Sequence, residues 1–122
     1  MIFVIYNMKN KWMEDLEQEV LSRGFQKIEQ GYELIKNVQQ PGQTISINGQ
    51  VMHQPGKTIE IKQTIVFNGE GWVGDENEEN KKEFTQIKFK IEQNGQELGT
   101  FEEGFYWDDI DHFKHMFNTI FK

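Results

Sequence analysis

Residues 84–107, FTQIKFKIEQNGQELGTFEEGFYW, predict a β-hairpin. Apolar and polar residues alternate along 84–93, which is typical of a half-buried strand. The Asn94–Gly95 pair that follows favours a two-residue type I′ turn, because both of its residues tolerate a positive φ. We therefore expect the first strand to pair antiparallel with the residues that follow the turn. The side chains expected to face a core are Ile87, Phe89 and Ile91.

A near-repeat upstream indicates more strands. The sequence QPGQTISI at 40–47 returns as QPGKTIEI at 54–61. Each copy places Pro–Gly, which is typical of a turn, before a short alternation of apolar and polar residues. Asn–Gly also occurs at 48–49 and 68–69 and predicts further hairpin turns. We expect an antiparallel meander of five to seven strands from residue 27 onward, with the isoleucines of both repeats in one core.

Two stretches have the apolar spacing of amphipathic helices. Residues 11–23 form the first, with Asn10 as its expected N-cap and Gly24 as its expected end. Residues 108–122 form the second, and Asp108 is its expected N-cap. The apolar stripe of this second helix comprises Ile110, Phe113, Met116, Phe117, Ile120 and Phe121.

The N-terminal run IFVIY at 2–6 is continuously apolar and of strand length, which predicts a buried strand. Together the elements predict a single α+β domain over residues 1–122. In this domain, an antiparallel meander sheet carries the N-terminal and C-terminal helices on one face. The opposite face of the sheet is expected to be polar or to be used for assembly.

Composition limits the partners of the chain. The net charge is −7, so binding to a nucleic-acid polymer or to an anionic membrane is not expected. The chain has no cysteine, which excludes disulfides and zinc–thiolate sites. Aromatic residues make up 13% of a chain that is only 36% hydrophobic, and we expect a homo-oligomer that buries the surplus aromatic surface. The N-terminus has no basic leader, so we expect a cytoplasmic protein.

Candidate metal and nucleophile sites have simpler explanations. Asp108, His112 and His115 share a helical face that suits a divalent metal, but capping and the helix dipole also explain the aspartates of this helix. The serines, Ser22 and Ser46, lack an elbow motif. We therefore expect no catalytic residues, no metal and no cofactor. An enzyme that uses paired carboxylates among the twenty acidic residues is the third hypothesis, and no motif argues for it.

Two loop motifs are also incomplete. The acidic stretch GDENEENKKE at 74–83 begins like a calcium loop, but the glycine and the final glutamate of such a loop are missing. The sequence NGEGWVGD at 68–75 is rich in glycine but lacks the Gly-Lys-Ser/Thr end of a phosphate-binding loop. A hairpin with a glycine-permitted bulge explains the second motif.

Phe84 is the residue whose position is hardest to explain by folding alone. It has the parity of the polar side of its strand, together with Lys88 and Lys90, and it follows Lys81–Lys82. An aromatic ring beside ammonium groups suits a nucleobase and its phosphates. Asn94 has the same parity and offers amide groups to a base edge. Alternatively, Phe84 packs in a subunit interface and Asn94 only forms its turn.

The order of elements, together with Phe84 and Asn94, resembles that of small phage proteins that counter the bacterial Thoeris defence by sequestering its signal. The resemblance implies a non-enzymatic homo-oligomer that binds cyclic ADP-ribose isomers, with Phe84 and Asn94 as the aromatic and amide contacts. The family also places arginines one turn apart in its C-terminal helix. This chain has none there, so a site for cyclic oligonucleotides is not expected.

The leading hypothesis is therefore a phage counter-defence protein that holds a cyclic nucleotide-type signal through Phe84, Asn94, Lys88 and Lys90. The alternative is an acidic protein-binding inhibitor or immunity protein. It would use the segment 75–83 against a basic partner, because opposite charges steer such partners together.

Overall fold

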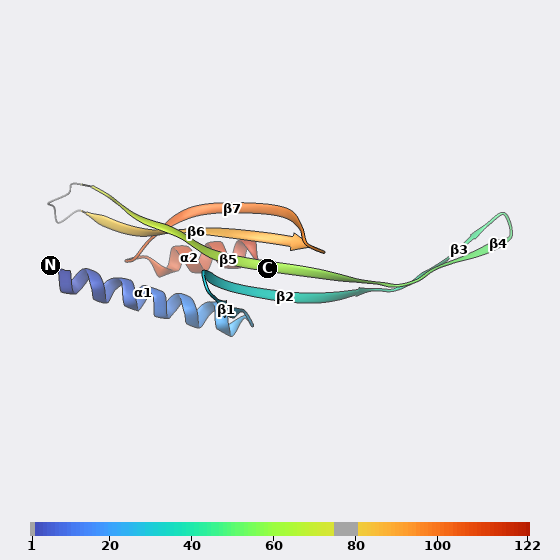
Figure 1. The fold of residues 1–122 in the computed structure, drawn as a ribbon, viewed down its shortest axis with the longest axis horizontal. Coiled ribbons are helices and arrows are strands. Elements are labelled where there is room, and N and C mark those ends of the chain that lie inside the picture. The colour runs from blue at the N-terminus through green and yellow to red at the C-terminus, as the bar shows by residue number, and fades with distance from the viewer. Residues whose placement is uncertain (1, 75–80) are drawn as a thin grey trace.

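A computed structural model describes residues 2–74 and 81–122, and it confirms the predicted α+β fold (Figure 1). The elements are α1 (Ile2–Ser22), β1 (Gln26–Ile28), β2 (Gly31–Gln40), β3 (Gln43–Ile47), β4 (Gln50–Gln54), β5 (Lys57–Val73), β6 (Lys82–Gln93), β7 (Gln96–Tyr106) and α2 (Ile110–Ile120). Five strands form an antiparallel sheet in the order β1-β2-β5-β6-β7, and β3 pairs with β4. Neither helix of the described chain combines the length and the hydrophobicity needed to span a bilayer.

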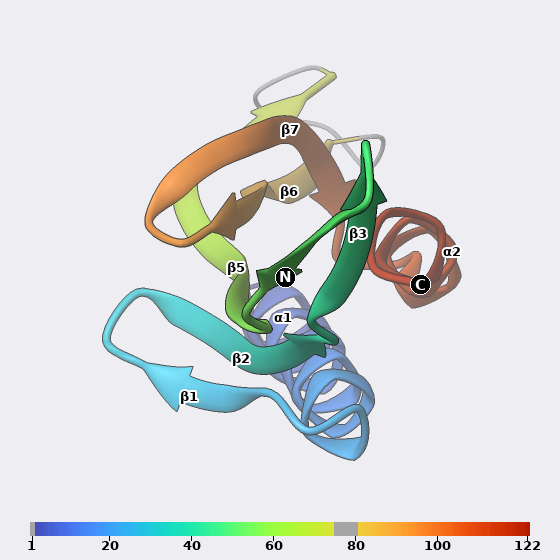
Figure 2. The same cartoon turned by 90° about the vertical axis from the view of Figure 1, so that its right-hand side faces the viewer.

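Both helices lie on one side of a curved sheet, as the view along the long axis shows (Figure 2). The core between the helices and the sheet is apolar and rich in aromatic rings. Its members are Trp12, Leu16, Val20, Phe25, Tyr32, Ile65, Ile87, Phe89, Phe105, Trp107, Phe113, Phe117 and Phe121. The alternation predicted for β6 is confirmed, since Ile87 and Phe89 are buried and Ile91 packs against this core.

The hairpin predicted at 84–107 is present as β6 and β7. Asn94 and Gly95 have φ angles of 50° and 81°, as a type I′ turn requires. The Asn–Gly pair at 48–49 likewise joins β3 to β4 through two positive φ angles. The pair at 68–69 is different, because it lies inside β5 where the register shifts between Phe67 and Glu70. The turn predicted at 68–69 is therefore wrong, and the pair forms a β-bulge opposite β6.

The two Pro–Gly steps do not reverse the chain, so the turns predicted there are wrong. The residues that flank the steps pair across one long hairpin, which places Pro41–Gly42 opposite Pro55–Gly56. A Cβ at Gly42 would lie only 2.6 Å from the carbonyl oxygen of Gln54, so the strands approach more closely here than a side chain permits. Proline also lacks the N–H that continues a ladder, so the paired strands are interrupted at this height.

The isoleucines of the two repeats consequently do not share a core. Ile45 and Ile47 are exposed on β3, and Ile59 and Ile61 are only partly covered on β5. The near-repeat builds two facing strands of one hairpin instead of successive strands of the meander. The strand expected from residue 27 is also divided, because β1 ends at Ile28 and β2 begins at Gly31 in antiparallel pairing.

The strand predicted at 2–6 is wrong, because these residues belong to α1. A short apolar run fits a buried strand and a helix equally well, and no Gly or Pro separates it from the helix that follows. Asn10 consequently lies inside α1 and does not cap it. Gly24 has a φ of 91° and follows the end of α1, as predicted. The N-cap of α2 is Asp109 instead of Asp108, and its side chain accepts a hydrogen bond from the His112 N–H at 3.2 Å.

Tyr32 connects the sheet to α1 with a polar contact at the edge of the core. Its ring is buried, and its hydroxyl donates a hydrogen bond to Glu17 Oε1 at 3.0 Å. Burial raises the pKa of Tyr32 well above its ordinary value of 10.0, and the hydrogen bond and negative charge of Glu17 raise the pKa further. The folded chain therefore retains the Tyr32 proton at a pH at which the unfolded chain loses it.

Replacing Tyr32 with phenylalanine tests this contact. We expect Tyr32→Phe to lower the free energy of unfolding by about 1–2 kcal/mol near neutral pH, because Glu17 loses its hydrogen-bond donor. Since the folded-state pKa is raised, the tyrosine contribution is complete below about pH 10 and declines as the pH rises above it. Urea unfolding at a series of pH values should show the difference between the two proteins shrinking above about pH 10. A difference that stays constant there would contradict this assignment.

Candidate functional site

The candidate site lies on the open face of the sheet, which we define as the face opposite the two helices. Successive side chains of a strand point to opposite faces. The odd-numbered residues of β6, such as Ile87 and Phe89, enter the core, so the even-numbered residues from Phe84 to Lys90 lie on the open face. The sequence prediction that Phe84, Lys88 and Lys90 share a face therefore agrees with the strand register.

Phe84 packs over β-sheet backbone because glycines stand on both sides of it. Gly71 on β5 is its register partner, and a Cβ built there would lie 2.7 Å from Phe84 Cζ. A Cβ at Gly104 on β7 would lie 3.0 Å from Phe84 Cδ2. The missing side chains leave room for the ring, and the ring in turn covers glycine backbone that water would otherwise reach. Phe84 remains partly exposed.

Tyr106 and Lys82 complete what we call the Phe84 platform, which comprises Phe84, Tyr106 and Lys82. The rings of Phe84 and Tyr106 meet edge to face, with centroids 6.2 Å apart and planes at 90°. Lys82 Nζ lies 5.1 Å from the Tyr106 ring centroid and 3.6 Å from Asp108 Oδ2. An ammonium group over an aromatic ring is a favourable arrangement. The platform thus combines partly exposed aromatic surface with one cation.

Lys88 and Lys90 lie on the same face but farther along β6. At a rise of about 3.3 Å per residue, they stand roughly 13 and 20 Å from Phe84. Lys88 faces Glu102 across the strands, and Lys90 Nζ lies 4.0 Å from Glu97 Oε1. Each of these lysines therefore has a carboxylate of β7 as its neighbour, which reduces the positive field available to a phosphate.

Asn94 lies at the far end of β6, about 33 Å from Phe84 at the same rise per residue. Its backbone N–H donates to the Glu60 carbonyl at 2.9 Å, and its side-chain Oδ1 accepts from the Glu60 N–H at 2.9 Å. Asn94 thus pairs with the backbone of β5 and extends the sheet by one residue. The structure places Phe84 and Asn94 too far apart to touch one nucleotide within the same copy of the chain.

Two of the three residues considered for a metal site have other partners in the structure. Asp108 pairs with Lys82, whereas His112 Nε2 lies 3.1 Å from Glu103 Oε2. In the part of the chain that the structure describes, no three His, Cys, Asp or Glu side chains gather in a way that suits a metal ion. The histidines of α2 therefore form no metal cluster with the aspartates that begin this helix.

The two serines lie at the end of α1 and on β3. Ser22 donates its hydroxyl hydrogen to the Glu19 carbonyl at 2.7 Å. Ser46 lies on β3 opposite Val51. Most of the acidic segment 75–83, namely residues 75–80, lies outside the described residues. The alternative site on that segment therefore stays a prediction.

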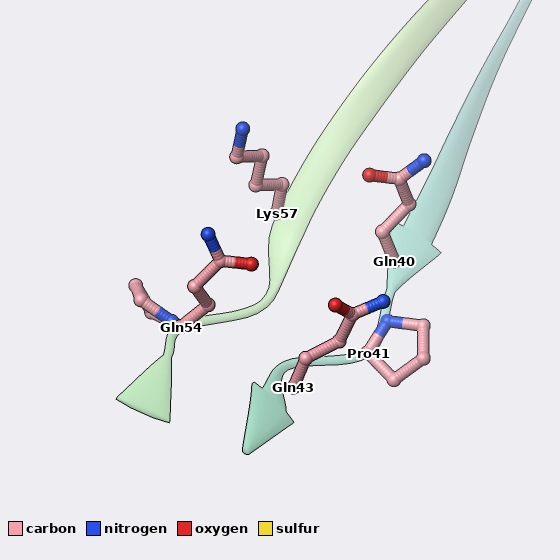
Figure 3. Close-up of a pocket in the computed structure, with 6 residues that line it drawn as sticks. Gln40, Pro41, Gln43, Gln54 and Lys57 are labelled. Carbon is pink, nitrogen blue, oxygen red and sulfur yellow. The ribbon is translucent and has the colours of Figure 1, made fainter. Parts of the chain in front are cut away.

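Two hollows of the described surface are small. One of about 120 Å³ lies at the Pro–Gly steps, and equivalent positions of the two repeats contribute to its lining (Figure 3). It is lined by Gln40, Pro41, Gln43, Gln54, Pro55 and Lys57. Another, of about 260 Å³, lies between α1 and β5, and the ion pair of Lys9 with Glu70 lines it. Both are below the roughly 300–1,000 Å³ that is usual for small-molecule sites.

Comparison of the chain with protein-family models, with curated proteins and with solved structures finds no match. The interpretation of the site therefore depends on its geometry. Sequence reasoning identified Phe84 but missed Tyr106, Gly71 and Gly104. The predicted hairpin, with an unbroken register from the Asn94–Gly95 turn, would pair Phe84 with Phe105. Gly104 and Tyr106 join the face of Phe84 only through the register shift between Ile91 and Glu92, and Gly71 becomes a neighbour only through the bulge in β5.

The position of the Phe84 ring predicts a shift in the NMR spectrum. Protons above an aromatic ring move upfield, so the α-protons of Gly71 should resonate upfield of the usual glycine range. In Phe84→Leu they should return to that range, because the ring current is lost. Gly99 provides the control, since its Cβ position has no other atom within 4 Å. Gly71 signals that are unchanged by the substitution would contradict the packing of Phe84 against this glycine.

Proposed function

We propose that this chain is a non-enzymatic binding protein that holds a planar, nucleotide-type ligand on the Phe84 platform. The observation that carries the proposal is the Phe84 ring itself, which packs over Gly71 and Gly104 and remains partly exposed. Exposed aromatic surface on the polar face of a sheet commonly marks a place where another group binds. A nucleobase stacks on such a ring without needing any particular hydrogen bonds.

The charges around the platform favour a ligand with few phosphates. Lys82 lies beside Tyr106 and can approach a phosphate, but the nearby carboxylate of Asp108 partly neutralises its positive charge. The whole chain has a net charge of −7, although salt screens charges that are farther than about 8 Å from the ligand. A cyclic ADP-ribose isomer is the proposed class. Binding alone would lower the free concentration of such a signal, as in counter-defence by sequestration.

The residues proposed to bind the ligand span a shorter part of β6 than those predicted from the sequence. Phe84, Tyr106 and Lys82 lie within reach of one base and its phosphate. Lys88 is the next cation along β6, and Lys90 and Asn94 lie beyond it. A ligand that touches Asn94 as well as Phe84 would need the two residues to come from different copies of the chain. We therefore include assembly into a homo-oligomer in the proposal.

Calorimetry with cyclic ADP-ribose isomers tests the ligand. Stacking on an aromatic side chain contributes about 1–3 kcal/mol per base, so Phe84→Leu should raise the dissociation constant by roughly 5- to 150-fold. Leucine keeps an apolar group over the two glycines, so the fold should survive. Phe101→Leu is the matched control, because Phe101 is also exposed, at 39%, but has the opposite parity on the sheet.

Three results of the calorimetry are informative. Binding that is weakened by Phe84→Leu and retained in Phe101→Leu supports the platform. An absence of heat with every isomer at micromolar wild-type protein rejects the ligand class. Equal binding by wild type and Phe84→Leu rejects the site.

A further inference from the structure

The hairpin formed by β2, β3, β4 and β5 projects beyond both helices as an extended arm (Figure 1). We define the arm as residues 35–58. Every residue of the arm is exposed, although almost all of it is strand. Beyond Lys36 the arm has only two strands, because pairing of β5 with β6 begins at Ile61, the register partner of Lys36. A two-stranded ribbon is marginally stable in water by itself, so an ordered arm of this length needs a surface to pack against.

The arm exposes apolar side chains along its length. Its large exposed apolar residues are Ile35, Val38, Ile45, Ile47, Val51 and Met52. Ile45 and Met52 are register partners, and Ile47 has the same parity on β3, so these three share one face of the ribbon. Val51 and Met52 expose 58% and 56% of their surface. Contiguous exposed apolar surface of this kind usually marks an interface.

The middle of the arm also lacks charge. Residues 37–56 contain no Asp, Glu, Lys or Arg, whereas 27% of the whole chain is charged. Natural edge strands are commonly protected by lysine and other charged residues, and here that protection is missing. Two copies of a chain with a net charge of −7 repel each other over most of their surfaces. The uncharged segment is where a second copy can approach at the lowest electrostatic cost.

The Pro–Gly steps restrict how a partner can approach. Pro41 and Pro55 lie on the two different strands of the ribbon, and regular strand is broken at 41–42 and at 55–56, so neither strand offers an unbroken edge. Growth of the sheet by continuous addition of strands to either edge is therefore interrupted. The Pro–Gly steps do not prevent one face of the arm from packing against the same face of a second copy. Such a contact uses identical surfaces on both copies, so it produces a dimer and leaves no site for a third copy.

We infer that the arm is the assembly element of this protein and packs face to face against the arm of a second copy around a twofold axis. Because side chains alternate between the two faces of a ribbon, about half of the residues of the uncharged segment 37–56 lie on one face, which corresponds to an interface smaller than the standard one of roughly 20–30 residues a side. A basic protein, a nucleic acid or an anionic membrane would instead be attracted by charge, which this segment lacks. The inference rests on the proposed assembly and is independent of the proposed ligand.

Native mass spectrometry and sedimentation of the full-length chain test the inference. The wild type should form a dimer, or an even-numbered assembly built from dimers. The double variant Ile47→Lys and Met52→Lys should raise the dimer dissociation constant at least about tenfold, because each lysine would have to be buried without a partner. Both residues are exposed and remote from the core, so circular dichroism and urea unfolding should report an unchanged fold.

The control variant is Val73→Lys. Val73 is also apolar and exposed, at 43%, but it lies at the opposite end of β5 from the arm. This variant should keep the mass of the wild type. A wild-type monomer at every concentration, an odd-numbered assembly, or an arm variant that keeps the wild-type mass would overturn the inference. Because the readout is mass without added ligand, these outcomes are distinct from a failure of the calorimetry.

Discussion

The packing of Phe113 between the two helices and the sheet is the contact on which the rest of the fold depends. Its ring centroid lies 5.7 Å from that of Phe117 and 6.4 Å from that of Trp12, and the ring also meets Phe89 and Phe105 on the sheet. One side chain of α2 therefore connects this helix to α1, β6 and β7. Because aromatic rings of this size supply much of the buried apolar area, the helices are held to one face of the sheet.

The one-sided core determines which surfaces are available for function. The helices cover one face of the sheet over part of its length, so the open face and the arm remain uncovered. On the open face, Lys62 and Lys90 pair with carboxylates of neighbouring strands, and the Phe84 platform forms an aromatic region. On the arm, apolar residues occur without charges nearby. Ligand binding and assembly are thus proposed for separate parts of one sheet.

The structural role of the near-repeat depends on how its two copies pair with each other. Each copy contributes one Pro–Gly step, and the two steps face each other across the hairpin, so the repeat produces a local pseudo-twofold arrangement. The glutamines around the steps line the small hollow of Figure 3. The repeated residues carry no catalytic chemistry. They interrupt both strands of the ribbon at the same point along its length. Because neither strand then offers a continuous edge, the exposed ribbon is less able to add to a neighbouring sheet.

Local chemistry determined much of the fold from the sequence alone. The 84–107 hairpin, the end of α1 at Gly24 and the apolar stripe of α2 follow from residue alternation, glycine conformation and helical spacing, which act over a few residues. The tertiary structure decided the rest. It placed 2–6 in a helix, paired the two Pro–Gly steps, and brought Gly71, Gly104 and Tyr106 beside Phe84 through two register shifts. These outcomes depend on which distant segments pair and in which register, and a local pattern encodes neither.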